Sequence, residues 1–171
     1  MFFTHYVASP VGPLCLIADD TALRELRFAP AEASLTPDLL DLPPPSPLLA
    51  ETAQQLGEYF AGLRQGFDLP LGPVGTPFQR RVWVELRAIP FGATTTYSAV
   101  ARRLGDALAV RAVGRANATN PLALVVPCHR VIGTGGKLTG FAGGLGTKQW
   151  LLRHEARATP AAGLFASLPG A

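Results

Sequence analysis

The sequence lacks any apolar run that approaches the roughly 20 residues needed to cross a bilayer, and its first residues lack the basic and apolar segments of a secretion signal. We therefore expect a cytoplasmic protein with no membrane partner. Only two of its 171 residues are cysteine, which excludes a disulfide framework and suits a reducing compartment. Its hydrophobic content of 48% excludes general disorder and predicts one or two compact globular domains.

Acidic residues are scarce in the second half of the chain. Residues 1–75 carry three arginines against nine acidic residues, a net charge of −6, whereas residues 76–157 carry twelve basic residues against three acidic ones, a net charge of +9. This asymmetry predicts that the second half binds a polyanion. Thirteen of the fifteen basic residues are arginine, an excess that codon bias also produces. Charge alone therefore leaves both nucleic-acid binding and a solvated basic face open.

The first half shows a pattern typical of a small β-meander followed by a helix. Short apolar runs at residues 2–8, 14–18 and 23–28 are separated by turn residues and predict three antiparallel strands. Residues 30–47 have no periodicity and predict an extended connection. A helix should follow, because apolar residues recur at helical spacing: Leu49, Ala53, Leu56, Phe60 and Leu63. No pattern here suggests chemistry, so we interpret this half as a support domain.

A Gly- and Pro-rich stretch at residues 66–77 coincides with the change in charge. We place the domain boundary there, which gives an N-terminal domain at 1–75 and a C-terminal domain at 76–171. The tail from about residue 158 has neither charge nor a clear period, so we expect it to be loosely ordered.

Three helices are predicted after the boundary. The first begins at Thr76, where proline follows and a glutamine three residues later completes a capping box, and it ends before Pro90. The second begins at Thr96 as its N-cap and ends at Gly105. Asp106 is a suitable cap for the third. The apolar faces are formed by Phe78, Val82, Leu86 and Ile89, then by Val100, Ala101 and Leu104, and then by Ala109, Ala112, Val113 and Ala116.

The second and third of these helices resemble a helix-turn-helix, because a tight glycine turn joins them and four arginines lie along them. An ordinary helical hairpin with a solvated basic face is the alternative. Small residues such as Ala112 and Gly114 would let the third helix approach a groove closely, while Arg111 and Arg115 project from one side at positions i and i+4. These features favour DNA binding.

Cys128 and His129 carry the clearest chemical signal. They follow residues 122–126, an apolar run between two prolines that predicts a short buried strand. Zinc would need about four ligands, and the neighbouring sequence offers no further cysteine or suitably spaced histidine, so we expect no metal. A free thiol is only slightly ionised at neutral pH, so a nucleophilic cysteine needs a neighbouring base or positive field. His129 and Arg130 can supply both.

A glycine-dense loop at residues 133–144 follows and could close over a flat ligand through its backbone. A final helix is expected to start near Thr147. Glu155 in this helix could orient the base of the Cys-His pair, as the third member of a catalytic triad does. The neighbouring His154 is interpreted as an ordinary helix residue, and Cys15 as a packed strand thiol.

The motifs of the second half resemble those of the O6-alkylguanine-DNA alkyltransferases, also called methylated-DNA-protein-cysteine methyltransferases. The similarity runs from Thr76 to Glu155 through FQRRVW, IPFG, TYSAVA, RAVGRAN, NPLALVVPCHRVIG, GFAGGL and KQWLLRHE. The resemblance implies an α/β (α+β) fold, with an RNase H-like domain of β-meander and helix before a helix-turn-helix, winged-helix-like domain that carries the active-site cysteine. The first half resembles the family by pattern and by the GTPFQ boundary.

The resemblance also implies how damaged DNA is held. In the family, the target nucleotide is flipped out of the duplex, and the helix-turn-helix works from the minor groove. Arg111 corresponds to the arginine that fills the vacated space, and Ala112, Gly114 and Arg115 share its helix. Tyr97 corresponds to the residue that turns the phosphate and protonates the departing guanine at N3. Asn120 corresponds to the asparagine that bridges the helix-turn-helix to the active-site segment.

The chemistry implied by the resemblance is irreversible. Cys128 attacks the alkyl carbon, His129 takes the thiol proton through a water, and Glu155 holds the imidazole. The thioether product cannot be hydrolysed, so each molecule acts once, without metal or nucleotide cofactor. The partner is double-stranded DNA containing O6-alkylguanine, and the protein is expected to be a monomer. Preference among alkyl groups, O4-alkylthymine repair and cooperative binding along DNA stay open.

The residues expected to surround the base are Val131, Phe141, Ala142 and Gly143. Phe141 stands where several relatives carry tyrosine, and Ala142 stands where some place a serine that bonds the guanine O6. Stacking survives the first change, but the second leaves recognition of O6 to backbone N–H groups. Arg115 occupies a position that is often small in relatives, which suggests an added phosphate contact.

Three other functions compete with alkyl transfer. A non-catalytic alkyltransferase-like protein would bind the flipped lesion without a reactive cysteine, and Cys128 argues against it. A Cys-His hydrolase would need an oxyanion hole and would turn over repeatedly. A plain basic DNA-binding domain with a structural cysteine would undergo no covalent change.

Overall fold

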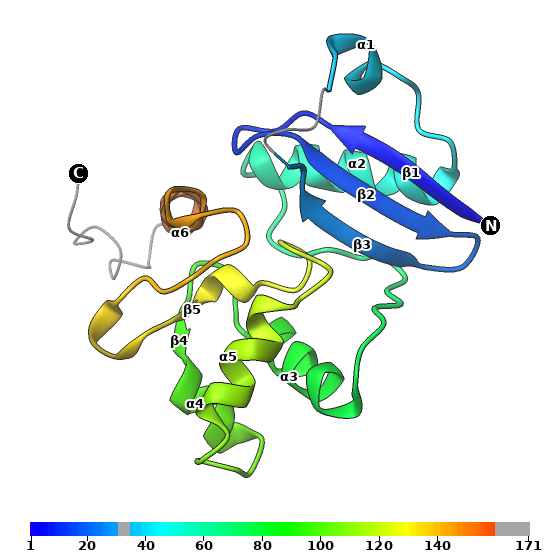
Figure 1. Ribbon diagram of the computed structural model, residues 1–171. Coiled ribbons are helices and arrows are strands. Elements are labelled where there is room, and N and C mark those ends of the chain that lie inside the picture. The colour runs from blue at the N-terminus through cyan, green and yellow to red at the C-terminus, as the bar shows by residue number, and fades with distance from the viewer. Residues whose placement is uncertain (31–34, 160–171) are drawn as a thin grey trace. The chain divides into compact units, whose positions relative to one another are not determined.

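The computed structural model describes residues 1–30 and 35–159, which form two compact units (Figure 1). The first unit comprises Met1–Val74 together with Pro121–Val125. The second comprises Gly75–Asn120 and the described chain from Val126 to Thr159. The predicted loose tail lies almost wholly outside the described residues. Within the described residues, no helix is long and apolar enough to cross a membrane.

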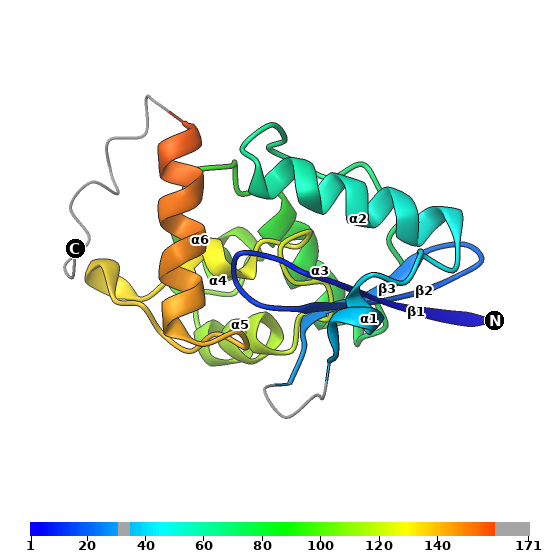
Figure 2. The same cartoon turned by 90° about the horizontal axis from the view of Figure 1, so that it is seen from above.

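The first unit is built on a three-stranded antiparallel sheet, as the turn-separated apolar runs predicted. Strands β1 (Phe2–Val7), β2 (Leu14–Asp19) and β3 (Leu23–Phe28) are adjacent in chain order. Helix α2 (Pro47–Phe60) lies against one face of this sheet (Figure 2). Leucines of β2, β3 and α2 are fully buried, so the core forms between the helix and the sheet: Leu14, Leu16, Leu23, Leu26, Leu49 and Leu56.

Two details of the first half differ from the sequence prediction. Helix α2 starts after Ser46, whose hydroxyl accepts from the Leu49 N–H, but it ends at Phe60. Leu63 therefore lies beyond the helix and is 81% exposed, because the helical period continues in the sequence past the point where the helix stops. The connection before α2 also contains a short helix, α1 (Pro37–Leu40), which a Pro at its first position favours.

The prediction of a strand at residues 122–126 is wrong. The segment is buried, yet it makes only one bridge, between Leu122 and Leu26 of β3, and then turns. The turn is closed by the Val125 N–H, which donates to the Ala123 carbonyl at 2.8 Å, and Leu124 has a φ of 68°. A short apolar run shows that a segment is buried but not whether its backbone is extended, which explains the error.

The second unit is mainly helical. It contains α3 (Pro77–Arg87), α4 (Tyr97–Arg103), α5 (Val110–Ala118) and α6 (Leu145–Ala158). Two-residue strands β4 (Thr95–Thr96) and β5 (Val131–Ile132) pair in parallel. The Trp83 indole N–H of α3 donates to the Ala116 carbonyl of α5 at 2.9 Å, which ties these two helices together.

The helix ends follow the sequence signals with one exception. Thr76 and Gln79 form the full capping box of α3, and Thr96 caps α4 by accepting from the Ala99 N–H. Gly105 takes the left-handed conformation, with a φ of 83°. Asp106, however, accepts from the Leu108 N–H inside the turn, and α5 begins later without a side-chain cap. Asp106 therefore stabilises the turn between α4 and α5 instead of the helix itself.

Candidate active site

Cys128 opens a single 3₁₀ turn, η1 (Cys128–Arg130), that packs against α6. Its side chain is buried, with 5% of the residue exposed. Burial raises the pKa of the Cys128 thiol, because a thiolate loses its hydration there. A hydrogen bond from Asn120 and the charge of Lys148 oppose this rise. Burial has the largest effect, so the pKa of the thiol stays above its ordinary value although Asn120 and Lys148 favour the ionised form.

His129 contacts Glu155 through a buried hydrogen bond. The Nε2 atom lies 2.6 Å from Oε1 of the carboxylate, and both side chains are almost fully buried. An ionised carboxylate only accepts hydrogen bonds, so Nε2 carries the ring proton and Nδ1 keeps its lone pair. Among the described residues, no group bonds to this buried Nδ1 atom. Burial lowers the pKa of His129, which keeps the ring neutral and able to accept a proton.

Glu155 is held on its other side by Arg130. The guanidinium donates from Nε to Oε2 at 2.9 Å and from Nη2 to Oε1 at 3.0 Å. Burial alone would raise the pKa of this carboxyl, but the charges and hydrogen bonds of His129 and Arg130 together lower the pKa well below its usual value. Glu155 therefore stays ionised and orients His129 without taking its proton.

The IPFG motif positions this ion pair. The Ile89 carbonyl accepts from Arg130 at 2.7 Å, and the Phe91 ring lies 5.6 Å from the guanidinium carbon. The Gly92 N–H donates to Glu155 at 3.1 Å, from a backbone with a φ of 76°. This left-handed φ favours glycine, and a Cβ at Gly92 would lie 2.8 Å from the Thr159 hydroxyl.

Lys148 is a candidate functional residue that the sequence interpretation missed. Its side chain is fully buried in α6, and its ammonium donates to the carbonyls of Val131 at 2.7 Å and Thr139 at 3.1 Å. Burial lowers the pKa of Lys148 to about 8, and the neighbouring Cys128 thiolate opposes that change. A signal was present in the sequence, because this lysine has the spacing of the buried face of α6: Lys148, Leu151, Leu152 and Glu155.

Two asparagines connect the end of α5 to the cysteine segment. Asn120 donates to the Val126 carbonyl at 2.8 Å and also forms a hydrogen bond with the Cys128 side chain. Asn117, which the sequence interpretation did not single out, donates to the Cys128 carbonyl at 3.4 Å. Asn117 is buried within α5, and only the structure identifies it.

The predicted DNA-binding residues share α5. Arg111 and Arg115 are exposed, while Ala112 and Gly114 are half-buried. A Cβ added at Gly114 would meet no atom within 4 Å outside the local helix backbone. Packing inside the protein therefore does not require glycine here. Tyr97, the remaining member of this group, is the first residue of α4.

The predicted substrate-binding residues fall into two places. Phe141 and Gly143 are half-buried and Ala142 is exposed, all in the loop before α6. Val131 instead lies in β5, with its side chain fully buried and its carbonyl bonded to Lys148. The loop closes on itself through the Gly133 N–H, which donates to the Lys137 carbonyl at 2.7 Å.

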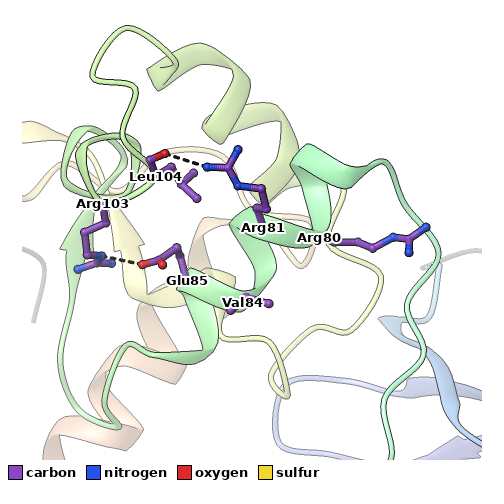
Figure 3. Close-up of a pocket in the computed structure, with 6 residues that line it drawn as sticks. All are labelled: Arg80, Arg81, Val84, Glu85, Arg103 and Leu104. Atoms are coloured by element: carbon purple, nitrogen blue, oxygen red, sulfur yellow. Dashed lines mark hydrogen bonds and ion pairs between the residues drawn. The ribbon is translucent and has the colours of Figure 1, made fainter.

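A separate pocket of about 320 Å³ lies between α3 and α4 (Figure 3). Arg81 donates to the Leu104 carbonyl at 2.9 Å, and Arg103 donates to Glu85 at 3.1 Å, so both arginines are already engaged. None of the predicted site residues line this pocket: its walls are Arg80, Arg81, Val84, Glu85, Arg103 and Leu104. In the described part of the chain, no three His, Cys, Asp or Glu residues are grouped as metal ligands.

Nearly the whole described chain is similar to known proteins. Residues 2–73 match the ribonuclease-like domain of 6-O-methylguanine DNA methyltransferase, and residues 77–157 match its DNA-binding domain. A methylated-DNA–protein-cysteine methyltransferase from Methanosarcina acetivorans is 45% identical over 148 residues, which cover 86% of this chain and 94% of the relative. The protein of the same name from Mycolicibacterium paratuberculosis is 46% identical, with coverage of 91% and 93%.

Solved structures agree with this similarity. The crystal structure of Mycobacterium tuberculosis O6-methylguanine methyltransferase matches with a TM-score of 0.81 and 42% identity, covering 94% of this chain and 96% of that one. A structure of the Mycobacterium tuberculosis protein in complex with DNA matches with a TM-score of 0.78 and 40% identity, covering 93% and 96%.

Proposed function

Because the chain belongs to the 6-O-methylguanine DNA methyltransferase family, we propose that Cys128 is the residue that accepts the alkyl group. The protein is a methylated-DNA–protein-cysteine methyltransferase, and it repairs DNA by direct alkyl transfer from O6-alkylguanine. It is a DNA-binding protein. Alkyl transfer to its own cysteine uses up one molecule of protein for each lesion, because a thioether has no hydrolytic route back to the thiol.

The transfer is a displacement at carbon. A bond forms between the Cys128 sulfur and the alkyl carbon, and the bond from that carbon to guanine O6 breaks. The electron pair of the broken bond moves into the purine, which leaves as guanine once it gains a proton. The enzyme must therefore remove a proton from sulfur and deliver one to the base.

His129 is the group that removes the thiol proton. Its Nδ1 atom carries the free lone pair, because Glu155 occupies Nε2 at 2.6 Å. Transfer through one water molecule delivers the thiol proton to this atom and leaves an imidazolium. Glu155 then stabilises the imidazolium, in the same way as the carboxylate of a catalytic triad. Arg130 keeps the carboxylate in place through its two hydrogen bonds.

Lys148 and Asn120 stabilise the thiolate that results. Burial makes a bare thiolate unfavourable at Cys128, while the Asn120 hydrogen bond and the Lys148 charge both favour it. Asn120 also connects the DNA-binding helix to the reacting sulfur, because it lies just after α5 and donates to the Val126 carbonyl. Burial still leaves the pKa of Cys128 above its ordinary value, so these contacts lower the cost of ionising the thiol when its proton is removed.

The DNA-facing roles belong to α4 and α5. Arg111, exposed in the first turn of α5, fills the space that the flipped nucleotide leaves, and Arg115 one turn later contacts a phosphate. Gly114 lets the helix backbone approach the minor groove. Tyr97 turns the phosphate and gives its proton to guanine N3. The loop residues Phe141 and Gly143 cover the base.

We also propose a role for each domain, an oligomeric state and a cellular compartment. Residues 1–75 act as the support domain, and residues 76–171 carry DNA binding and alkyl transfer. The protein acts as a monomer in the cytoplasm, where a reducing environment keeps Cys128 as a thiol. Both cysteines are free thiols, which suits such a compartment.

The observation that carries the proposal is the buried His129–Glu155 hydrogen bond next to Cys128. The test is incubation with a duplex containing O6-methylguanine, followed by mass spectrometry of the intact protein and its peptides. We expect one methyl group on the peptide that contains Cys128, with Cys15 unmodified, and no transfer in a Cys128→Ser variant. Loss of the lesion while Cys128 stays unmodified would refute the assignment.

A further inference from the structure

We propose that Thr139 is a positioning residue for alkyl transfer, because its hydroxyl binds the Tyr97 phenol oxygen and directs the Tyr97 proton toward the departing guanine. The inference rests on the proposed role of Tyr97 as the proton donor. Thr139 lies in the loop before α6, 42 residues from Tyr97 in sequence, and its Oγ1 donates to the phenol oxygen at 2.9 Å. Both side chains are half-buried.

The direction of this hydrogen bond decides where the Tyr97 proton can go. Each hydroxyl has one hydrogen to donate and can also accept. When Thr139 uses its hydrogen on the phenol oxygen, the Tyr97 hydrogen points elsewhere and stays available to a third group. Guanine N3 is a strong acceptor once the bond to the alkyl carbon starts to break. The resulting chain runs from Thr139 through Tyr97 to the base, and each hydrogen bond in it strengthens the next.

The contact becomes stronger as the reaction proceeds. While the Tyr97 proton moves to guanine N3, negative charge develops on the phenol oxygen. The Thr139 hydroxyl then donates to a charged acceptor, which makes a shorter and stronger hydrogen bond. An interaction that strengthens in the transition state raises the rate of the chemical step and not the affinity for DNA.

The proton balance closes without an outside acid. His129 gains the proton that leaves Cys128, and guanine gains the proton that leaves Tyr97. After the product departs, the phenolate of Tyr97 and the imidazolium of His129 return to neutral by exchange with water. The net change is alkyl transfer from O6 to sulfur and release of a neutral guanine.

The main chain of Thr139 is fixed independently of its hydroxyl. The Lys148 ammonium bonds the Thr139 carbonyl at 3.1 Å and the Val131 carbonyl at 2.7 Å, which joins the loop to β5. Substitution of the Thr139 side chain leaves these bonds in place. Thr139→Val, which has the same shape without the hydroxyl, therefore removes the contact with Tyr97 selectively.

The experiment measures the single-turnover rate of methyl transfer from duplex DNA for Thr139→Val, Thr139→Ala and Thr139→Ser. We expect the valine and alanine variants to be about 10- to 100-fold slower, the range for a lost hydrogen bond to a charged group. Serine keeps the hydroxyl and should stay near the wild-type rate. Duplex affinity, measured with Cys128 replaced by alanine, should not change.

The Tyr97→Phe background separates this proposal from the proposed function. Thr139→Val should slow the wild type but cause no further loss when combined with Tyr97→Phe, because Thr139 acts only through the phenol oxygen. If the two substitutions lower the rate independently, so that their fold-losses multiply in the double variant, the Thr139 proposal is overturned while Tyr97 remains the donor. A wild-type rate for Thr139→Val and Thr139→Ala, or a lower melting temperature without a slower rate, would overturn it also. A wild-type rate for Tyr97→Phe would overturn both assignments.

Discussion

Glu155 accepts two hydrogen bonds from Arg130, at 2.9 and 3.0 Å, on a carboxylate that also faces His129 at 2.6 Å. The guanidinium balances the carboxylate charge, so Glu155 can orient the imidazole without converting it to a resting imidazolium. The arrangement keeps His129 neutral in the free protein, with its lone pair on Nδ1. Such a buried network is costly to break, because removal of one partner leaves a buried charge.

Acid should destabilise the protein from about pH 6.5 downward. Burial lowers the pKa of His129 from the ordinary value of 6.5, so the unfolded chain binds the proton before the folded protein does. The stability that the folded protein gains from a neutral His129 is complete above about pH 6.5 and is lost as the pH falls toward the folded-state pKa of this residue. The pKa of Glu155 is also lowered, so its contribution is complete above the ordinary value of 4.5 and declines below it.

Urea unfolding between about pH 8 and pH 4, roughly the range over which histidines and carboxylates titrate, tests this expectation. The measurement compares the wild type with His129→Asn and His154→Asn. The His129 variant should lose less stability than the wild type between about pH 7 and pH 5. The His154 variant serves as a matched control on a half-exposed residue of α6. Because His5 also has a pKa lowered by burial, the difference between variants carries the conclusion. Parallel curves for the wild type and His129→Asn would contradict it.

Lys148→Met should slow methyl transfer at neutral pH by about tenfold or more, equivalent to about 1.4 kcal/mol in the barrier. Burial raises the pKa of Cys128, and the positive charge of Lys148 reduces this rise. Without that charge, a smaller fraction of Cys128 is ionised. Because the pKa of Lys148 is lowered to about 8, the wild type loses this charge above that pH. The difference between the two proteins should therefore shrink as the pH rises.

The only other lysine supplies the control for this substitution. Lys137 is exposed in the loop at residues 133–144, so Lys137→Met removes the same charge away from the buried face of α6. Single-turnover rates across the pH range would be compared for the two variants. Equal rates for Lys148→Met and Lys137→Met would exclude a role for Lys148 at the thiol.

Gly114→Ala should stabilise the protein and weaken DNA binding at the same time. Alanine inside a helix is favoured over glycine by about 0.5–1 kcal/mol, and the new Cβ meets nothing inside the protein. On the groove side, the added methyl group would keep α5 away from the DNA backbone. Melting temperature and duplex affinity, both measured with Cys128 replaced by serine, give the two readouts. Higher stability with unchanged affinity would mean that α5 does not approach DNA at Gly114.

Arg111→Ala should slow repair of duplex DNA far more than reaction with free O6-benzylguanine. A free base needs no flipping, so only the duplex reaction depends on a side chain that fills the stack. Arg115, exposed one turn later on α5, is the matched control. Arg115→Ala should lower duplex affinity and its salt dependence while the maximal rate stays close to the wild type. Equal losses on both substrates for Arg111→Ala would remove it from the flipping role.

Several features of the fold could be predicted because they depend on neighbouring residues. Thr76 and Thr96 begin helices where a hydroxyl can accept a backbone N–H, and Gly105 ends one where a left-handed residue is needed. Asp106 was wrongly assigned as a helix cap because the same side chain also satisfies a turn. The prediction of a strand at residues 122–126 was wrong, because a turn that is buried on all sides has the same run of apolar residues as a buried strand.

By itself, the sequence determined the chemical class through the resemblance of its motifs to one family, because a cysteine next to a histidine is also compatible with a Cys-His hydrolase. It also determined the order of the meander and the helices, through local periodicity and capping. Only the tertiary structure decided that Lys148 is buried where its charge acts on the thiol and that Thr139 bonds Tyr97 across 42 residues. Such contacts depend on how distant segments pack and on how far water is excluded, which no local pattern encodes.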